Sequence, residues 1–204
     1  MQSKDVTGIY VEGHIHIYDP EKKVTYVNKR NAIHYENFSQ ALAQSISNSG
    51  QGIINQMVFG NGGTYVDPTG IITYLTPNSV GSNASLYNQT YSKVVDSNSS
   101  LNIDPTRNFM ETRHVTGTNY TDILVTCLLD YGENISGQSA FDVTNNNNSP
   151  AVFDELGLVS YNYTTNSPTL LTHVIFHPVQ KSLNRLIQID YTVRIQTLTG
   201  AAGV

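Results

Sequence analysis

Hydrophobic and polar residues alternate most regularly near the C-terminal end of the chain. The apolar face of this run carries Ile187, Ile189, Tyr191, Val193 and Ile195. Such period-two alternation predicts a strand with one buried face. The segment before it, residues 170–176, consists almost entirely of apolar and β-branched residues, which is typical of a strand buried on both faces. His177 and Pro178 should then stop this strand or place a bulge in it.

Earlier parts of the chain carry the same kind of pattern, with turn residues between the runs. Residues 8–18 alternate at period two, and a second alternating run follows the polar segment 19–23, which contains Pro20. The two runs predict a β-hairpin. Further strands are predicted at residues 53–59, 107–115 and 122–129, and a strand, a turn and a strand at residues 63–77.

One short helix is predicted among these strands. Asn37 and Gln40 lie three residues apart, in the manner of a capping box. The residues that follow at helical spacing are Phe38, Ala41, Leu42, Ser45 and Ile46. Gly50 and Gly52 should end the helix, which then covers one face or one open end of the sheet.

Two long polar segments are predicted to lack regular structure. Residues 80–96 are expected to be mostly loop, either an arm that reaches a neighbouring subunit or a packed surface loop. Residues 133–150 include four consecutive asparagines, Asn145 to Asn148, and predict an exposed excursion rather than a domain boundary. The small apolar end, residues 198–204, is either a frayed terminus or a tail that docks on a partner.

The composition supports a β-rich fold. Charged residues make up only 13% of the chain. Asn, Ser and Thr together make up roughly three in ten, which favours turns and strand surfaces over helices. A chain of 204 residues forms one domain by default. We therefore predict an all-β fold, a single antiparallel β-sandwich-like domain over residues 1–204, with roughly eight or more strands and one short helix.

The charge pattern and the single cysteine exclude several classes of protein. The net charge is −5, and the eleven Lys and Arg residues are scattered, apart from a small group at Lys22, Lys23, Lys29 and Arg30. Binding to a phosphate backbone needs a denser basic face, so we expect no direct nucleic-acid contact. The first residues lack an apolar signal core and no run approaches membrane length, so we expect no membrane contact. Cys127 lies alone in the apolar run ILVTCLL, which predicts a buried, inert thiol.

The most enzyme-like pattern is the pair His14 and His16. Residues two apart on a strand project from the same face and can share a metal ion, and Glu21 follows them. This stretch is similar to the first metal motif of the cupin family. It departs from that motif because Thr73 stands where the third metal-binding histidine is expected, Asn28 stands where a glycine closes the motif, and Glu21 lies in a turn. Two ligands without a third make a poor metal site, so a cupin-like protein is only an alternative, and we expect no metal and no cofactor.

No other group of residues completes a catalytic set. His173 and His177, four apart on a predicted strand, should share one face. Asp154 and Glu155 are adjacent and should point to opposite faces, so they could not flank one bond. No Gly-x-Ser-x-Gly elbow is present. We therefore expect a protein that is not an enzyme; a carbohydrate-binding module is a further alternative, although the chain has no Trp for sugar stacking.

The last third of the chain has a distinctive order of segments. FDELGL at residues 153–158 is followed by LLTHVIFHPVQK at residues 170–181 and by a strand that ends YTVRI at residues 191–195. This order resembles a recurrent element of structural proteins in tailed-bacteriophage particles, in which the acidic spot belongs to a structural turn. The stretches VTYVNKRNAIHYENFSQALAQSI, residues 24–46, and MVFGNGG, residues 57–63, add to the likeness.

The resemblance implies a bacteriophage virion structural protein. We expect a component of a ring at the neck, collar or tail that forms homo-oligomers and binds other virion proteins. A capsid decoration protein is the alternative. The resemblance also implies that the protein is made in the host cytoplasm and resides in the virion. The motifs that carry the resemblance determine turns and core packing, so they do not identify the position in the particle or the residues of the interfaces.

Overall fold

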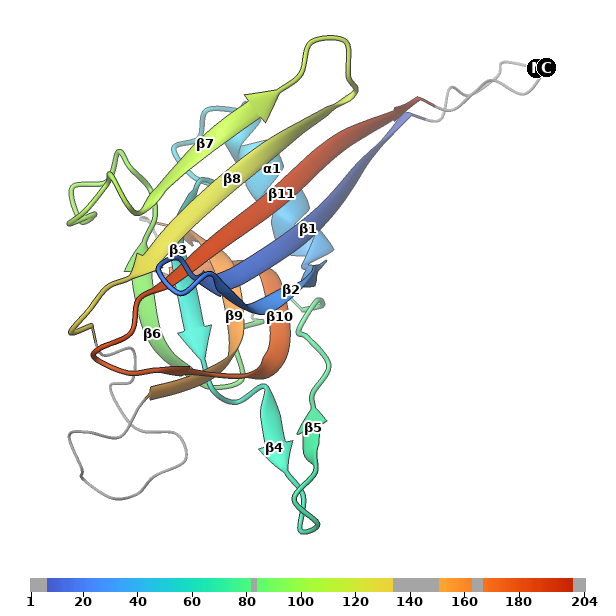
Figure 1. Cartoon of the computed structure of the whole chain (residues 1–204). Helices are drawn as coiled ribbons and strands as arrows, with labels where there is room; N and C mark the ends of the chain where they lie inside the picture. The colour runs from blue at the N-terminus through green and yellow to red at the C-terminus, as the bar shows by residue number, and fades with distance from the viewer. Residues whose placement is uncertain (1–6, 82–83, 134–150, 163–166, 200–204) are drawn as a thin grey trace.

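The computed structural model of the chain describes residues 7–81, 84–133, 151–162 and 167–199. These residues contain eleven strands and one helix (Figure 1). The elements are β1 (Thr7–Asp19), β2 (Val24–Ile33), α1 (Tyr35–Ile46), β3 (Ile54–Gly60), β4 (Thr64–Val66), β5 (Ile72–Tyr74), β6 (Gln89–Val94), β7 (Phe109–His114), β8 (Tyr120–Leu129), β9 (Ala151–Asn162), β10 (Ser167–Lys181) and β11 (Ile187–Thr199). No helix in the described parts of the chain is long and apolar enough to cross a membrane.

Nine of the strands form one large sheet that bends into two layers. The order is β6-β3-β9-β10-β2-β1-β11-β8-β7, and every neighbouring pair is antiparallel. The bend occurs at β2, which pairs with β1 over most of its length. Only its last two residues, Ala32 and Ile33, pair with β10, at His173 and Thr172. The predicted all-β, sandwich-like fold with one short helix is confirmed.

The core lies between the two layers. Alternate residues of β1 and β11, such as Ile15 and Ile189, point inward and are fully buried. In the opposite layer the ring of Phe153 meets the rings of Phe59 and Phe176 edge to face, with centroids 5.7 and 5.6 Å apart. Cys127 is buried as predicted, and burial raises the pKa of its thiol to about 12, so the thiol is inert at neutral pH.

The helix begins earlier than the sequence pattern predicts. Its N-cap is His34, whose Nδ1 accepts a hydrogen bond from the backbone N–H of Asn37 at 3.3 Å. Asn37 is therefore wrong as the cap. Its side chain is buried, and its Nδ2 donates to the carbonyl oxygen of Leu170 at 2.8 Å, which ties the helix to β10. The predicted helical residues Phe38 and Ala41 are buried against the sheet.

The segment 80–96 was predicted to be mostly loop, and part of that prediction is wrong. Residues 89–94 form β6, an edge strand that pairs with β3. Its burial does not alternate as that of β11 does, so the sequence carries no strong period-two signal there. Most of the second predicted loop, residues 133–150, lies outside the described residues, as does most of the predicted tail, residues 198–204.

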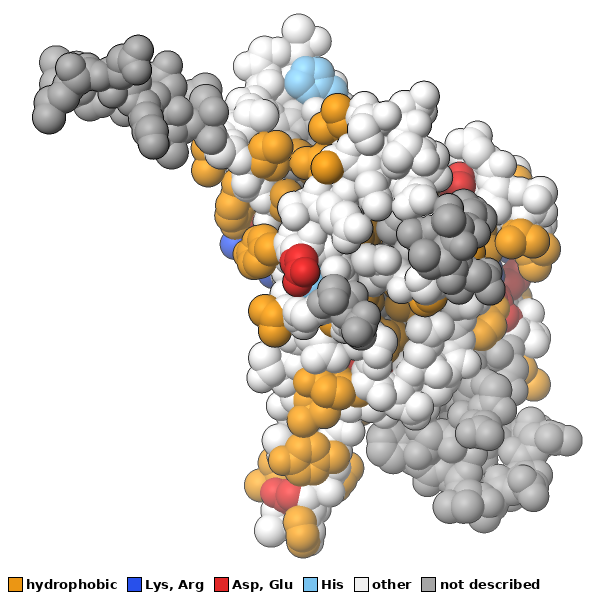
Figure 2. Space-filling model, turned by 180° about the vertical axis from the view of Figure 1, so that it is seen from behind, with side chains coloured by type: hydrophobic (Ala, Val, Ile, Leu, Met, Phe, Trp, Pro, Cys, Tyr) orange, Lys and Arg blue, Asp and Glu red, His pale blue; other side chains and the backbone are white. Residues whose placement is uncertain are grey.

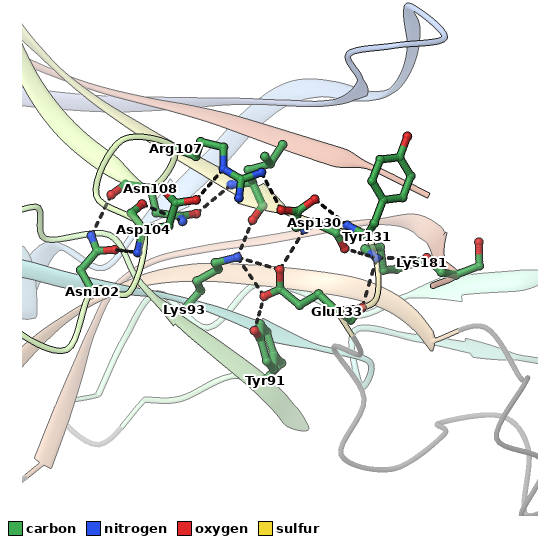
Figure 3. Close-up of polar contacts among 12 residues, drawn as sticks. Tyr91, Lys93, Asn102, Asp104, Arg107, Asn108, Asp130, Tyr131, Glu133 and Lys181 are labelled. Carbon is green, nitrogen blue, oxygen red and sulfur yellow. Dashed lines mark hydrogen bonds and ion pairs between the residues drawn. The ribbon is translucent and has the colours of Figure 1, made fainter. Parts of the chain in front are cut away.

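Polar contacts join β6 in one layer of the sheet to β8 in the other (Figure 3). Lys93 of β6 donates to the backbone oxygen of Leu128 in β8 at 2.5 Å and to both carboxylate oxygens of Glu133 at 2.7 and 2.9 Å. The hydroxyl of Tyr91 donates to the same carboxylate, and burial together with that contact raises the pKa of the Tyr91 phenol. The ion pair is largely shielded from water, which makes it stronger than an exposed one.

Lys181, the last residue of β10, holds the same region through a second set of contacts. Its side chain is 2% exposed, and its Nζ donates to the backbone oxygens of Asp130, Glu133 and Ser182 at 2.9, 3.1 and 3.0 Å. An ammonium group has three N–H donors, so all three are satisfied. Burial lowers the pKa of Lys181, because a charged ammonium group loses its hydration inside the protein.

Candidate functional site

A short hairpin projects from the body of the molecule (Figure 1). We call it the arm; it consists of β4, the turn at residues 67–71 and β5. Asp67 preforms the turn, because its carboxylate accepts the backbone N–H of Thr69 at 2.8 Å and that of Ile71 at 3.0 Å. The Thr69 hydroxyl and these amides lower the pKa of Asp67. The carboxylate is thus used within the turn and does not give the arm a free charged group.

The surface of the arm is apolar. Tyr65, Val66, Ile71 and Tyr74 are 51%, 55%, 63% and 49% exposed. Asp67 is the only charged residue from position 61 to position 80. In Figure 2 hydrophobic side chains cover the projecting hairpin nearly to its tip. A contiguous apolar surface on a protruding element is typical of a site that a partner covers.

Three buried side chains, Asp154, Glu155 and His173, fix the base of the arm; we call them the anchor cluster. All three are 0% exposed. Asp154 accepts the backbone N–H groups of Gly63 and Thr64, both at 2.9 Å, and the Thr64 hydroxyl. Burial raises the pKa of Asp154, and these donors oppose that shift. The glycine-rich run before β4 is therefore held by a carboxylate.

Glu155 holds two segments of the chain together: the one that precedes the arm, at Gly62, and the one that precedes β6, at Tyr87 and Asn88. Its Oε1 accepts the backbone N–H groups of Gly62 at 3.0 Å and Asn88 at 2.8 Å. Its Oε2 accepts the N–H of Tyr87 at 2.9 Å and lies 3.0 Å from Nε2 of His173. Burial alone raises the pKa of Glu155, but His173 and the three amides outweigh burial and lower it. The carboxylate is therefore held in its ionised form.

The hydrogen bonds of His173 determine its tautomer. Nδ1 accepts the backbone N–H of Asn78 at 2.8 Å, so Nδ1 cannot carry a proton. The proton is then on Nε2 and is donated to Glu155. His177 was predicted to share a face with His173, but it is exposed, and its Nδ1 lies 3.2 Å from the hydroxyl of Tyr74 on the arm. His177 thus contacts the arm itself at Tyr74, whereas His173 holds the segment that follows the arm at Asn78.

A bulge in β10 lies opposite Asp154 and separates His173 from His177, which were predicted to share one face. Glu155 pairs with Ile175 and Phe153 pairs with Val179, so three residues of β10 lie opposite Asp154 alone. The predicted bulge at His177 and Pro178 is confirmed, and it separates His177 from His173. Asp154 and Glu155 both lie within β9, in agreement with their treatment as adjacent strand residues, and not in the turn that the resemblance to the phage element implied.

Glycine is required where the backbone approaches the anchor cluster. A Cβ on Gly60 would lie 2.4 Å from Oε1 of Glu155 and 2.5 Å from the carbonyl oxygen of Asn88. A Cβ on Gly62 would lie 2.8 Å from the backbone nitrogen of Asn88. The combination of a Gly-Gly run with an adjacent pair of acidic residues elsewhere in the chain is the sequence signal that could have indicated this cluster.

The weak metal candidates His14, His16 and Glu21 do not come together. His14 is exposed, whereas His16 stacks on Tyr18 with ring centroids 4.5 Å apart and lies 3.0 Å from the hydroxyl of Thr25. Glu21 accepts a hydrogen bond from Tyr131. Among the described residues no three His, Cys, Asp or Glu side chains are grouped so that they could hold a metal ion.

His14 does border a surface depression on the outer face of the sheet. The depression has a volume of about 290 Å³ and is lined by Glu12, Gly13, His14, Arg30, Thr192 and Arg194. Arg30 lies 3.6 Å from Glu12, and Arg194 makes a two-pronged pair with Asp122 at 2.7 and 2.9 Å. Each guanidinium already faces a carboxylate, so the depression has no uncompensated positive charge for an anion.

The anchor cluster predicts a pH dependence of stability. Because the pKa of Glu155 is lowered from its ordinary value of 4.5, the contribution of this carboxylate to stability is complete above pH 4.5 and is lost as the pH falls through the folded-state pKa. The difference in unfolding free energy between the natural protein and Glu155→Gln should therefore shrink in acid, as measured by urea unfolding across a pH series. Asp154→Asn is the matched control with the opposite trend, since the Asp154 pKa is raised. A difference that does not change with pH would contradict the assignment.

The geometry thus gives an arm that is anchored at its base and whose one carboxylate, that of Asp67, is held within the turn. Comparisons with known proteins add no further identification. No family model matches the chain, and no curated protein and no solved structure is significantly similar to it.

Proposed function

We propose that the chain is a structural component of a tailed-bacteriophage particle, built into a ring at the neck, collar or tail and bound there to other virion proteins. The observation that carries the proposal is the arm. A two-stranded hairpin of this length is only marginally stable in water on its own. This arm nevertheless has a preformed turn, a base held by buried carboxylates and an exposed apolar surface. Such preorganisation lowers the entropic cost of docking, which suits an assembly element.

The segment order FDELGL, LLTHVIFHPVQK and YTVRI supports the same proposal through its resemblance to phage structural proteins. In this chain the first two segments carry the anchor cluster and the bulge, and the third is part of β11, which pairs with β1 on one side and with β8 on the other. The residues that resemble the phage element are thus the ones that position the arm and build the core. Their role here is architectural, in agreement with a component that assembles rather than catalyses.

Copy number in purified particles tests the proposal. A closed cyclic ring, or a small stack of rings, requires roughly a few to a few dozen copies per particle. We expect quantitative mass spectrometry to find this number, and we expect a strong loss of incorporation for the triple variant Tyr65→Ser, Ile71→Ser and Tyr74→Ser. Ile103→Ser is the matched control, because Ile103 is 93% exposed on a loop outside the arm. Hundreds of copies would indicate a capsid decoration protein, and absence from particles would refute a virion role.

A further inference from the structure

The first part of β1 has an unpaired edge. Residues 7–12 pair with β11 on one side, but β2 begins to pair with β1 only at Gly13, because the end of β2 turns away to β10. Within the described chain no backbone hydrogen bond reaches the other edge of residues 7–12. In Figure 1 this end of the β1-β11 ribbon extends beyond the rest of the sheet. The N–H and C=O groups of this edge are therefore free to bind another strand.

This edge lacks the features that protect free strands in monomeric proteins. Residues 7–11 and their partners, residues 195–199, carry no charge and no proline. Ile9, Tyr10 and Leu198 are 57%, 41% and 46% exposed. The edge strand β7 provides a contrast, since its exposed side chains include Glu111 and Arg113, and charged side chains deter pairing with other chains. The sequence thus protects the edge of β7 with charged side chains and leaves the edge of β1 ready to pair.

We infer that the arm of one copy of this chain docks on the free edge of β1 in a second copy, where a strand of the arm extends the sheet. The inference deepens the proposed function, on which it rests, by naming the partner. The arm and the free edge lie at opposite ends of the molecule (Figure 1), so they cannot meet within one chain. Both are mostly apolar, β-branched and aromatic. The two carboxylates within them already have partners, Asp67 inside its turn and Glu12 beside Arg30, so neither places an unpaired charge in the contact.

The geometry of this contact determines the kind of assembly. Each copy offers one arm and one edge, so the contact is head to tail rather than two-fold symmetric. Such a contact generates a ring when the rotation between copies closes, and a filament when it does not. The anchor cluster contributes because it fixes the direction in which the arm leaves the body, and a defined direction is what makes the rotation between copies reproducible.

Two complementary variants test the inference. Val66→Lys with Ile71→Lys blocks the arm and leaves the edge, whereas Ile9→Lys with Leu198→Lys blocks the edge and leaves the arm. All four positions are exposed, so both proteins should keep the urea midpoint of the natural chain. We expect each variant alone to be monomeric in sedimentation velocity and an equimolar mixture to form one-to-one dimers that grow no further. Ile103→Lys, the control, should assemble like the natural protein.

A disulfide trap detects the contact when association is weak. Val66→Cys and Ile9→Cys proteins, mixed and mildly oxidised, should give a cross-linked heterodimer, and the natural Cys127 will not interfere because it is 0% exposed. Self-association of the arm-blocked variant would instead indicate pairing of two β1 edges and would overturn the inference. A mixture that forms neither dimers nor cross-links would also overturn it. Both results are obtained in solution, so they are independent of whether particles contain the chain, which tests the proposed function separately.

Discussion

Glu155→Leu should lower the free energy of unfolding by roughly 4 kcal/mol or more. Leucine removes the acceptor for four donors at once: the N–H groups of Gly62, Tyr87 and Asn88, and Nε2–H of His173. A buried donor left without a partner costs about 1–3 kcal/mol, and some water will enter to reduce the sum. Because small domains are stable by only about 5–15 kcal/mol, the variant should be close to unfolding at room temperature.

Guanidinium or urea unfolding measures this effect, and Glu155→Gln is the informative comparison. Glutamine keeps the shape and one oxygen acceptor but replaces the other oxygen with a donor that faces two further donors. The loss of unfolding free energy in Glu155→Gln should therefore be smaller than that in Glu155→Leu but still measurable. If Glu155→Leu were within about 1 kcal/mol of the natural protein, the anchor cluster would not contribute to the fold as its hydrogen bonds indicate.

Lys181→Met should cost roughly 3 kcal/mol, the second largest loss that we expect. Methionine has a similar volume and avoids the desolvation of a buried charge, which favours the variant. It also leaves the backbone oxygens of Asp130, Glu133 and Ser182 without their donor. The lowered pKa of Lys181 shows that burial disfavours the charge, which reduces the loss. Three buried backbone oxygens left without a donor cost about 1–3 kcal/mol each, and this larger sum determines the direction of the effect.

The matched control for Lys181→Met is Lys29→Met. Lys29 also donates to a backbone oxygen, that of Ile175 at 2.8 Å, but its side chain is exposed and water can replace it. Its substitution should change the unfolding free energy by less than about 1 kcal/mol. Equal effects of the two substitutions in urea unfolding would show that the buried position of Lys181 has no special importance.

Periodicity predicted most strands because their two faces differ in exposure. The alternation of β11 and of β1 is strong, since one face of each is core and the other is surface. The burial of β6 does not alternate, so a short polar edge strand looked like loop. The helix start was misplaced because a histidine served as the cap, a role that capping statistics give to Ser, Thr, Asp and Asn.

The candidate site was less accessible to sequence reasoning, for a physical reason. The residues Asp154, Glu155 and His173 were all noticed, but their partners are backbone N–H groups about 70 to 95 positions away, which no side-chain pattern encodes. The rule that adjacent strand residues point to opposite faces assumes a regular ladder. Here a bulge lies opposite Asp154, and the loop that enters the arm passes close enough to be held by both carboxylates.

The order of the strands also sets a constraint on how the molecule can fold. β1 lies between β2 and β11, so one of its edges is completed only by the last strand of the sheet. The pairs range from Tyr18 with Gln188 to Thr7 with Thr199, a closure across nearly the whole chain. Contacts of such long sequence separation slow folding, because a large loop entropy must be paid before they form. During synthesis, the N-terminal hairpin must therefore wait with an open edge until β11 has emerged from the ribosome.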